Sequence, residues 1–192
     1  MATNNGTTVF IAGSRRLSKL SSDVKVRLDR IADKGLTAII GDANGVDKAV
    51  QKYFVDRNYR KVVVFCMEGG CRNNVGRWPT RVIAAPSPKR RDFAHFATKD
   101  RAMAEEADFG LMLWDGQSRG TLTNIVDLVR KEKLVVVYVS TDKEFRNLRN
   151  SSDLALMLRR VDPVELERVD HDLKFSGKAV TPSGSSARLS LF

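Results

Sequence analysis

The chain has 192 residues, of which 42% are hydrophobic and 29% are charged, and this composition suits one domain with a core of ordinary size. It holds no apolar run near the ~20 residues that span a bilayer, and its polar start lacks a signal-peptide core, so we expect a cytoplasmic protein without a membrane partner. The formal net charge of +10 favours anionic partners, and because the basic residues are scattered, nucleic acid is less favoured than a nucleotide-like small molecule.

Short apolar runs alternate with longer amphipathic stretches along the chain. The runs predict strands over Thr7–Ala12, Leu36–Ile40, Lys61–Cys66, Thr80–Ala84, Asp108–Trp114 and Leu134–Val139. Helical spacing predicts helices over Ser21–Asp33, after Gly41–Asp47 through Phe54, and over Arg91–Ala107, Gly120–Lys131 and Leu154–Leu158. This alternation predicts a Rossmann-like, doubly wound α/β fold, whose mainly parallel sheet is covered by helices on both faces.

The chain divides into one expected domain and two tails. We expect a flexible N-terminus over 1–6, a single domain over 7–169, and a flexible C-terminal extension over 170–192. Ser, Gly, Pro and Thr dominate from about Ser176 onward, a composition that is typical of flexible segments.

The segment Met67–Pro79 is irregular and rich in Gly, Asn and Arg. Two interpretations stay open for it. It is either a solvated loop or a lid from which Arg72, Asn73, Asn74 and Arg77 reach a ligand.

The two cysteines, Cys66 and Cys71, lack the dense spacing of a secreted disulfide scaffold. A zinc site needs four ligands, and neither His95 nor His171 has the required spacing to the cysteines. We therefore expect two reduced thiols, and we expect neither a metal nor a cofactor.

The first of three glycine-bearing loops after predicted strands is Gly13-Ser14-Arg15. Ligands bind beyond the carboxyl ends of the strands in an open parallel sheet, so these loops are the predicted site. Gly13 permits a close backbone approach, the Ser14 hydroxyl donates hydrogen bonds, and the Arg15 guanidinium suits a phosphate or carboxylate. The alternative is a plain turn with a surface arginine.

The second loop joins a strand directly to the start of a helix. Backbone amides at such a position form an anion site, and its candidate ligand-binding residues are Gly41, Asp42, Asn44, Gly45 and Asp47. Asp47 either accepts a bond from a ribose hydroxyl or is a carboxylate at the helix start without a ligand role. The loop is not a P-loop, because no Gly-Lys-Ser/Thr follows it.

The third loop again joins a strand to a helix, and it is the most specific of the three. Its candidate ligand-binding residues are Trp114, Asp115, Gly116, Ser118, Gly120 and Thr121. Amides and a hydroxyl at the helix start can hold a phosphate. Asp115 can bind a ribose hydroxyl or act as an acid or base, and Trp114 either stacks on a base or packs in the core. On the preceding predicted helix, Lys99 either faces the same site or faces solvent.

Gly13-Ser14-Arg15, GDANGVD at 41–47 and ADFGLMLWDGQSRGT at 107–121 together resemble the SLOG superfamily, which is named after Smf/DprA-like proteins and the "lonely guy" enzymes. The resemblance covers roughly 7–140 and is closest to small bacterial members with a Gly-Ser-Arg start and a Trp-Asp-Gly-x-Ser-x-Gly-Thr loop. It implies a Rossmann-like fold, a nucleotide or nucleotide-derived ligand, and a homo-oligomer, either a dimer or a tetramer.

The enzymatic branch of the superfamily carries Arg-Lys-x-x-Met followed by Pro-Gly-Gly-x-Gly-Thr-x-x-Glu. In this sequence Thr98 falls at the arginine position and Asn124 at the position of the catalytic glutamate. Cleavage of an N-glycosidic bond builds positive charge on the sugar, which a neutral amide stabilises less well than a carboxylate. Because this sequence lacks the catalytic glutamate, the resemblance does not imply hydrolase activity for it. If the protein is a hydrolase, Asp47 and Asp115 are the candidate catalytic carboxylates.

Three functions follow as hypotheses. The first is a sensor or regulator that binds a nucleoside phosphate or an NAD/ADP-ribose-like ligand at the strand ends. The second is an N-glycosidic hydrolase or transferase acting on nucleoside 5′-monophosphates, and the third is DprA-like binding of single-stranded DNA. Whether the protein is an enzyme stays open at this stage.

Overall fold

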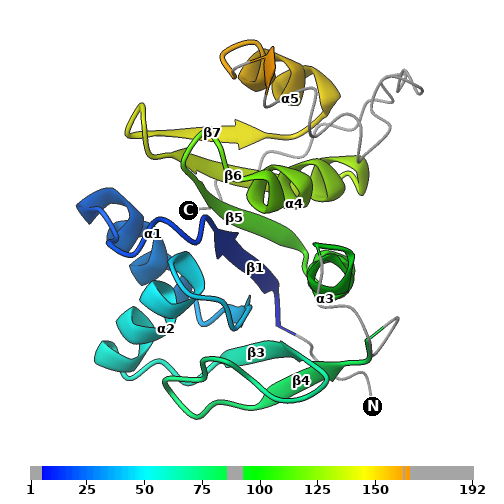
Figure 1. Ribbon diagram of the computed structural model, residues 1–192. Helices are drawn as coiled ribbons and strands as arrows, with labels where there is room; N and C mark the ends of the chain where they lie inside the picture. The colour runs from blue at the N-terminus through cyan, green and yellow to red at the C-terminus, as the bar shows by residue number, and fades with distance from the viewer. Residues whose placement is uncertain (1–5, 86–92, 162, 165–192) are drawn as a thin grey trace.

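A seven-stranded sheet forms the centre of the protein in a computed structural model, which describes residues 6–85, 93–161 and 163–164 (Figure 1). The strands are β1 (Thr8–Gly13), β2 (Thr37–Ile40), β3 (Val62–Met67), β4 (Thr80–Ile83), β5 (Phe109–Trp114), β6 (Leu134–Val139) and β7 (Glu144–Leu148). Their order is β4-β3-β2-β1-β5-β6-β7, and every neighbouring pair is parallel except β6 and β7. The predicted mainly parallel α/β sheet is confirmed.

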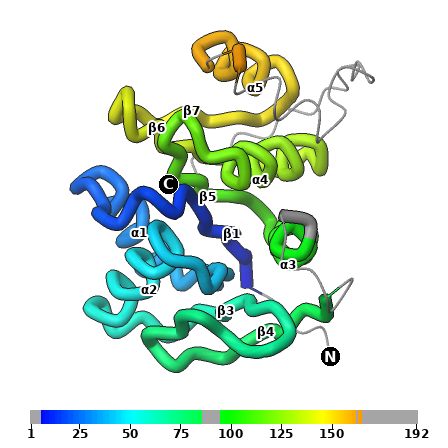
Figure 2. The backbone as a smooth tube through the Cα atoms, in the orientation of Figure 1, coloured from blue at the N-terminus to red at the C-terminus, as the bar shows by residue number. Residues whose placement is uncertain are grey.

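Five helices connect or follow these strands: α1 (Ser22–Asp33), α2 (Val46–Asp56), α3 (Phe93–Glu106), α4 (Arg119–Arg130) and α5 (Ser151–Leu158). Figure 2 shows α1 and α2 on one side of the sheet and α3 and α4 on the other. Successive strand residues point to opposite faces, so Val9 and Ile11 pack with α1 and α2, while Phe10 and Ala12 pack with α3 and α4. The predicted doubly wound arrangement with two covered faces is therefore confirmed.

The antiparallel edge strand β7 was not predicted from the sequence. Its residues, EFRNL, are mostly polar, and only Leu148 is fully buried. An edge strand needs no continuous apolar run, because one side faces solvent. The sequence pattern there is accordingly weak, although the strand pairs with β6 from Val135 to Val139.

The expected tails fall largely outside the described residues. Of the expected flexible N-terminus over 1–6, only Gly6 is described, and the expected extension over 170–192 lies wholly outside. Within the described part of the chain, no helix combines the length and apolarity that a membrane span requires.

The chain changes direction across the sheet at one place. From β1 it passes outward through β2 and β3 to β4, and it then returns to β5 on the other side of β1. In open parallel sheets this switch point leaves a crevice beyond the carboxyl ends of the two central strands. The fold therefore places the expected ligand site at the loops that follow β1 and β5.

Candidate functional site

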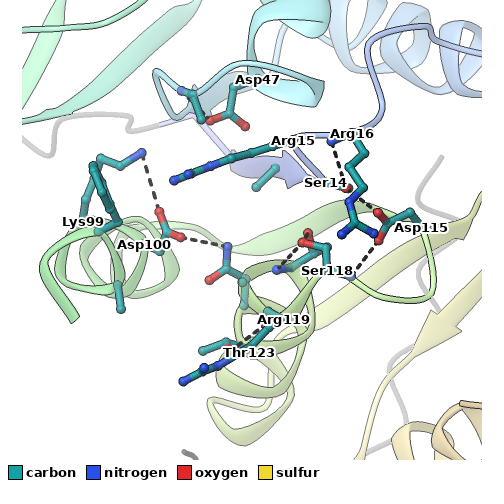
Figure 3. A pocket seen from close by; sticks show the side chains of 18 of the residues that line it. Ser14, Arg15, Arg16, Asp47, Lys99, Asp100, Asp115, Ser118, Arg119 and Thr123 are labelled. Atoms are coloured by element: carbon teal, nitrogen blue, oxygen red, sulfur yellow. Dashed lines mark hydrogen bonds and ion pairs between the residues drawn. The ribbon is translucent and has the colours of Figure 1, made fainter. Parts of the chain in front are cut away.

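A cavity of about 530 Å³ opens beyond the ends of β1 and β5, and we call it the first cavity (Figure 3). It is lined by residues of the three predicted loops, of α3 and α4, and by one residue of the segment after β3. Its charged residues are five basic side chains and three carboxylates: Arg15, Arg16, Arg72, Lys99 and Arg119, with Asp47, Asp100 and Asp115.

The loop after β1 is fastened to the loop after β5. The buried Ser14 hydroxyl donates to Asp115 Oδ2 over 2.6 Å and accepts from the Arg16 amide over 3.1 Å. Arg16 in turn donates through Nη1 to Gln117 Oε1 over 2.6 Å. Arg15 points across the cavity instead, with its guanidinium carbon 5.3 Å from the centre of the Phe96 ring (Figure 3).

Asp115 holds the loop after β5 in shape. Besides the Ser14 hydroxyl, its carboxylate accepts the amides of Ser118 over 2.7 Å and Gln117 over 3.2 Å. Partial burial acts to raise the pKa of Asp115, but these hydrogen bonds outweigh it and lower the pKa. The carboxylate is therefore ionised at neutral pH, and its acceptor capacity is largely used by the protein.

The N-terminus of α4 faces the first cavity. Ser118 caps the helix, since its hydroxyl oxygen accepts the Thr121 amide over 3.4 Å and the Thr121 hydroxyl over 2.9 Å. A Cβ added to Gly120 would meet no atom within 4 Å, so the space beside this first turn is open. The positive end of the helix dipole thus adds to the basic side chains.

Behind the cavity, Asp42 forms ion pairs with two of these basic residues. It accepts from Arg72 Nη2 over 2.6 Å, Nε over 3.1 Å and the Arg72 amide over 3.0 Å, and it lies 3.4 Å from Lys99 Nζ. Burial acts to raise the pKa of Asp42, but the hydrogen bonds from Arg72 and the charge of Lys99 lower it to about 2. Asp42 therefore positions Arg72 and Lys99 and does not itself line the cavity.

Asp47 is the most perturbed carboxyl group of the site. It is buried, it lines the cavity, and its Oδ2 accepts the Ala43 amide over 3.1 Å. Burial raises the pKa of Asp47 to about 6, although the charge of Lys99 acts in the opposite direction. The group can therefore exchange a proton near neutral pH.

A further carboxylate, Asp100, lies next to the side-chain amide of Asn124. Asn124 donates through Nδ2 to Asp100 Oδ2 over 3.3 Å, and Lys99 Nζ lies 3.6 Å from Asp100 Oδ1. Both Asp100 and Asn124 line the first cavity. Asp100 was not among the predicted site residues, although it directly follows Lys99 on α3.

The residues predicted for the site separate into two groups. The cavity is lined by Gly13, Ser14, Arg15, Asp47, Lys99, Asp115, Ser118, Gly120 and Thr121. It is not lined by Gly41, Asp42, Asn44, Gly45, Trp114 and Gly116. The solvent-facing alternative for Lys99 is wrong, because the side chain is buried beside Asp42.

Trp114 belongs to the core, which corrects the idea that it stacks on a base. It is only 2% exposed, packs with α3 and α4, and donates through Nε1 to the Ser118 carbonyl over 3.1 Å. Gly45 likewise has a structural role, because it adopts φ 78° and a Cβ there would collide with the Arg15 backbone. The second loop thus supports the first one and contributes Asp47 and Ala43 to the cavity.

Several residues that line the cavity were not predicted as site residues from the sequence: Arg16, Ala43, Phe96, Asp100, Gln117, Arg119, Thr123 and Asn124. Arg16 and Gln117 lie within or beside the motifs, so proximity was a usable signal. Phe96 and Asp100 lie on α3, whose orientation toward the cavity is decided by packing.

The segment after β3, for which a lid was one of the two interpretations, contributes Arg72 to the first cavity and contains a disulfide. Arg72 lines the cavity with its guanidinium carbon 4.7 Å from the centre of the Phe96 ring, whereas Asn74 bonds to the Trp78 backbone. Cys66 and Cys71 are paired, with 5.0 Å between their Cα atoms, which corrects the expected reduced thiols. The chain turns back on itself after β3, and such a local pair requires no disulfide-dense scaffold.

Comparison of the sequence with family models and with curated proteins found no match. Among solved structures, the chain is similar to DNA processing protein A of Helicobacter pylori, whose structure was described for its single-stranded DNA binding mode. The TM-score is 0.56 and the sequence identity is 14%, and the match covers 89% of this chain and 82% of that chain. DNA processing protein A (DprA) of Streptococcus pneumoniae has a TM-score of 0.52 and 13% identity, over 82% of this chain and 58% of that chain, so this chain spans little more than half of that relative. At these identities the likeness shows a shared Rossmann-like fold.

Proposed function

We propose that the first cavity binds a nucleoside phosphate and that the protein acts as a sensor or regulator which responds to this ligand. The observation that carries the proposal is the convergence of five basic side chains and the N-terminus of α4 on one cavity at the switch point of the sheet. Five basic side chains stand against the three lining carboxylates and Asp42 behind the cavity, so a small positive excess remains, to which the N-terminus of α4 adds.

The cavity offers a different partner for each part of such a ligand. The open space at Gly120 and the side chain of Arg15 suit the phosphate. Carboxylates at Asp47 and Asp100 are acceptors for ribose hydroxyl groups. Ala97 and Met103, which line the cavity on α3 beside Phe96, give it an apolar side suited to a base.

Isothermal titration calorimetry with AMP, adenosine and inorganic phosphate tests this proposal. We expect AMP to bind more tightly than either part, and Arg15→Gln to weaken AMP binding about tenfold or more, because a charge-assisted hydrogen bond is lost. Arg60→Gln is the matched control, since Arg60 is exposed before the start of β3, at the other end of the strands. Absence of saturable AMP binding, or an equal loss in Arg60→Gln, would overturn the proposal.

Hydrolysis of the N-glycosidic bond is a second candidate, favoured by the contact between Asp100 and Asn124. In this reaction the oxygen of water bonds to C1′, the bond from C1′ to the base breaks, and the water proton passes to a carboxylate before reaching the departing base. Asp100 supplies a carboxylate beside the family's glutamate position, and Asp47 is a second one.

Chromatography of free base released from nucleoside 5′-monophosphates tests the second candidate. Asp100→Asn should abolish release, while Asp56→Asn, at the exposed end of α2, should leave it unchanged. If wild type releases no base from any monophosphate, this candidate is excluded and binding alone remains.

Binding of single-stranded DNA is a further candidate because of the similar fold of the Helicobacter pylori protein and the net charge of +10. Fluorescence anisotropy of a labelled oligothymidylate at low and high salt tests it. Affinity that falls steeply with salt would support phosphate-backbone contacts. Absence of binding at low salt would exclude this candidate.

A further inference from the structure

The disulfide between Cys66 and Cys71 lies beside a residue of the first cavity. Cys66 belongs to β3 and is fully buried, whereas Cys71 is partly exposed. Arg72 directly follows Cys71, and of the residues between β3 and β4, all of which the structure describes, it alone lines the first cavity. The disulfide therefore restrains the backbone from which this arginine enters the cavity.

The chain between the two cysteines has unusual conformational freedom when no cross-link closes it. It contains Gly69 and Gly70 with φ values of 100° and 106°, and a Cβ added to Gly70 would meet no atom within 4 Å. Glycine has more backbone freedom to lose than any other residue, so this stretch gains entropy when it opens. The disulfide removes part of that freedom, because it closes the loop covalently.

The contacts that hold Arg72 at the cavity compete with water. Its side chain is 39% exposed, and two bonds from its guanidinium and one from its amide go to Asp42. Asn73 adds a bond from Nδ2 to the Asp42 carbonyl over 2.8 Å. Each such bond has a modest net free energy, because water offers the same groups other partners. We therefore expect the population of Arg72 at Asp42 to fall when the cross-link is opened.

The departure of Arg72 changes the charge of the first cavity. Asp42 is only 2% exposed, and among the described residues Lys99 is then the one basic side chain within 4.0 Å of its carboxylate. Because Lys99 lines the cavity and lies 3.4 Å from Asp42, an Asp42 without Arg72 draws the charge of Lys99 away from a ligand. The cavity thus loses one basic side chain directly and part of the effect of a second one.

We propose that the pair of Cys66 and Cys71 is a redox switch of the first cavity. In the disulfide state Arg72 is held in place and the nucleoside phosphate binds tightly, and in the dithiol state it binds weakly. The inference rests on the proposed function of this cavity, and it adds that a thiol reductant regulates the binding.

The reducing step is an exchange with a dithiol. One thiolate of the reductant attacks Cys71 Sγ, the bond between the two protein sulfurs breaks, and Cys66 leaves as a thiolate that takes up a proton. The second thiol of the reductant then displaces Cys71 from the mixed disulfide. The protein gains two electrons and two protons, and the reductant becomes a disulfide.

The structure accommodates both redox states of Cys66. Its sulfur lies 3.9 Å from the Val64 carbonyl oxygen, which is an acceptor for the proton of a free thiol. Cys66 is also held in β3, where its register partner on β4 is Val82. Reduction therefore leaves the strand unchanged and frees the Cys71 side of the loop.

Calorimetric titration of AMP into the oxidised and the reduced full chain tests the inference. We expect reduction by dithiothreitol to weaken AMP binding at least about fivefold. Far-ultraviolet circular dichroism should show the same fold in both states, because the effect is assigned to Arg72. Equal AMP affinities in the two states, or unfolding on reduction, would overturn the inference.

Three variants assign the effect to its residues. Arg72→Gln should weaken AMP binding and remove the difference between the redox states. Arg77→Gln is the matched control, since Arg77 is exposed in the same segment but does not line the first cavity, and it should keep both the affinity and the difference. Cys71→Ser should bind AMP as weakly as the reduced wild type, with or without reductant. A redox dependence that persists in Arg72→Gln would contradict the proposed switch.

Thermodynamic linkage requires the reverse effect as well, because a ligand that prefers the disulfide state must stabilise that state. A dithiothreitol buffer with a fixed ratio of reduced to oxidised reagent sets the fraction of protein disulfide, and alkylation followed by mass spectrometry measures it. We expect saturating AMP to raise this fraction. A fraction that AMP leaves unchanged would also overturn the inference.

The titrations separate this inference from the proposed function. If AMP binds equally well in both redox states, the switch falls and the proposed function stands. If AMP binds in neither state, both fall. If the disulfide state binds AMP more tightly and Arg72→Gln abolishes the difference, the inference is supported.

Discussion

The Ser14 hydroxyl donates to Asp115 Oδ2 across 2.6 Å and thereby joins two loops whose residues are 101 positions apart in the chain. Within the loop after β1, the Arg16 amide donates to the Ser14 hydroxyl oxygen. Within the loop after β5, the Ser118 amide donates to the Asp115 carboxylate. Together with the bond from Arg16 to Gln117, this pair holds the two loops side by side at the edge of the first cavity.

Ser14→Ala should lower the free energy of unfolding by about 1–3 kcal/mol, because Asp115 loses a buried donor to its charged carboxylate. Urea unfolding followed by circular dichroism measures the change. Ser18→Ala is the control, since Ser18 is exposed in the same connection. Equal stabilities of the two variants would mean that the bond contributes nothing net.

Asp47→Asn should stabilise the protein at neutral pH by about 1–3 kcal/mol, since the wild type holds a buried carboxylate charge there. The pKa of Asp47 rises from 3.8 to about 6 on folding, so the folded protein binds more protons in that interval. The contribution of Asp47 is therefore full below pH 3.8 and is lost as the pH rises through about 6.

Thermal unfolding across this pH interval provides the measurement. Wild-type stability should contain a component that falls as pH rises from 3.8 to about 6, and Asp47→Asn should lack it. Asp42 titrates separately, because its pKa is lowered to about 2 and its contribution is lost only as the pH falls from 3.8 toward that value. An unchanged pH profile in Asp47→Asn would contradict the assignment.

Gly120→Leu should weaken AMP binding at least about tenfold, because the leucine side chain enters the open space beside the first turn of α4. Gly120→Ala is the matched control, since alanine and leucine have similar helix propensities and differ mainly in volume. Both variants should be as stable as wild type or slightly more so. Unaltered AMP affinity in Gly120→Leu would place the phosphate elsewhere.

Cys71→Ser should lower the free energy of unfolding by about 2 kcal/mol, because the disulfide to Cys66 closes a short loop in the unfolded chain. Chemical unfolding with and without a thiol reductant measures the effect. Reductant should destabilise the wild type to the level of Cys71→Ser and leave the variant unchanged. A wild type that is insensitive to reductant, with two thiols that react with an alkylating agent, would contradict the pairing.

How much of the site could be anticipated depends on where each residue lies relative to the strands. Ser14 directly follows the apolar run of β1, and Thr121 lies in the loop and first helical turn after the apolar run of β5. Because the carboxyl ends of parallel strands meet at one edge of the sheet, both residues could be predicted for the site. Asp100 lies on a helix whose rotation about its own axis is set by packing against β1, β3 and α4. No local sequence pattern indicates that rotation, so the contact between Asp100 and Asn124 could not be predicted from the sequence.

The sequence by itself determined the class of fold, because the period of its apolar residues distinguishes buried strands from helices and their alternation requires a parallel sheet. It also determined which loops carry the candidate site. Only the tertiary structure decided which side chains face the first cavity and why Trp114 and Asp42 stand behind it. These are properties of side-chain direction and of contacts between distant segments, which arise only when the elements pack together.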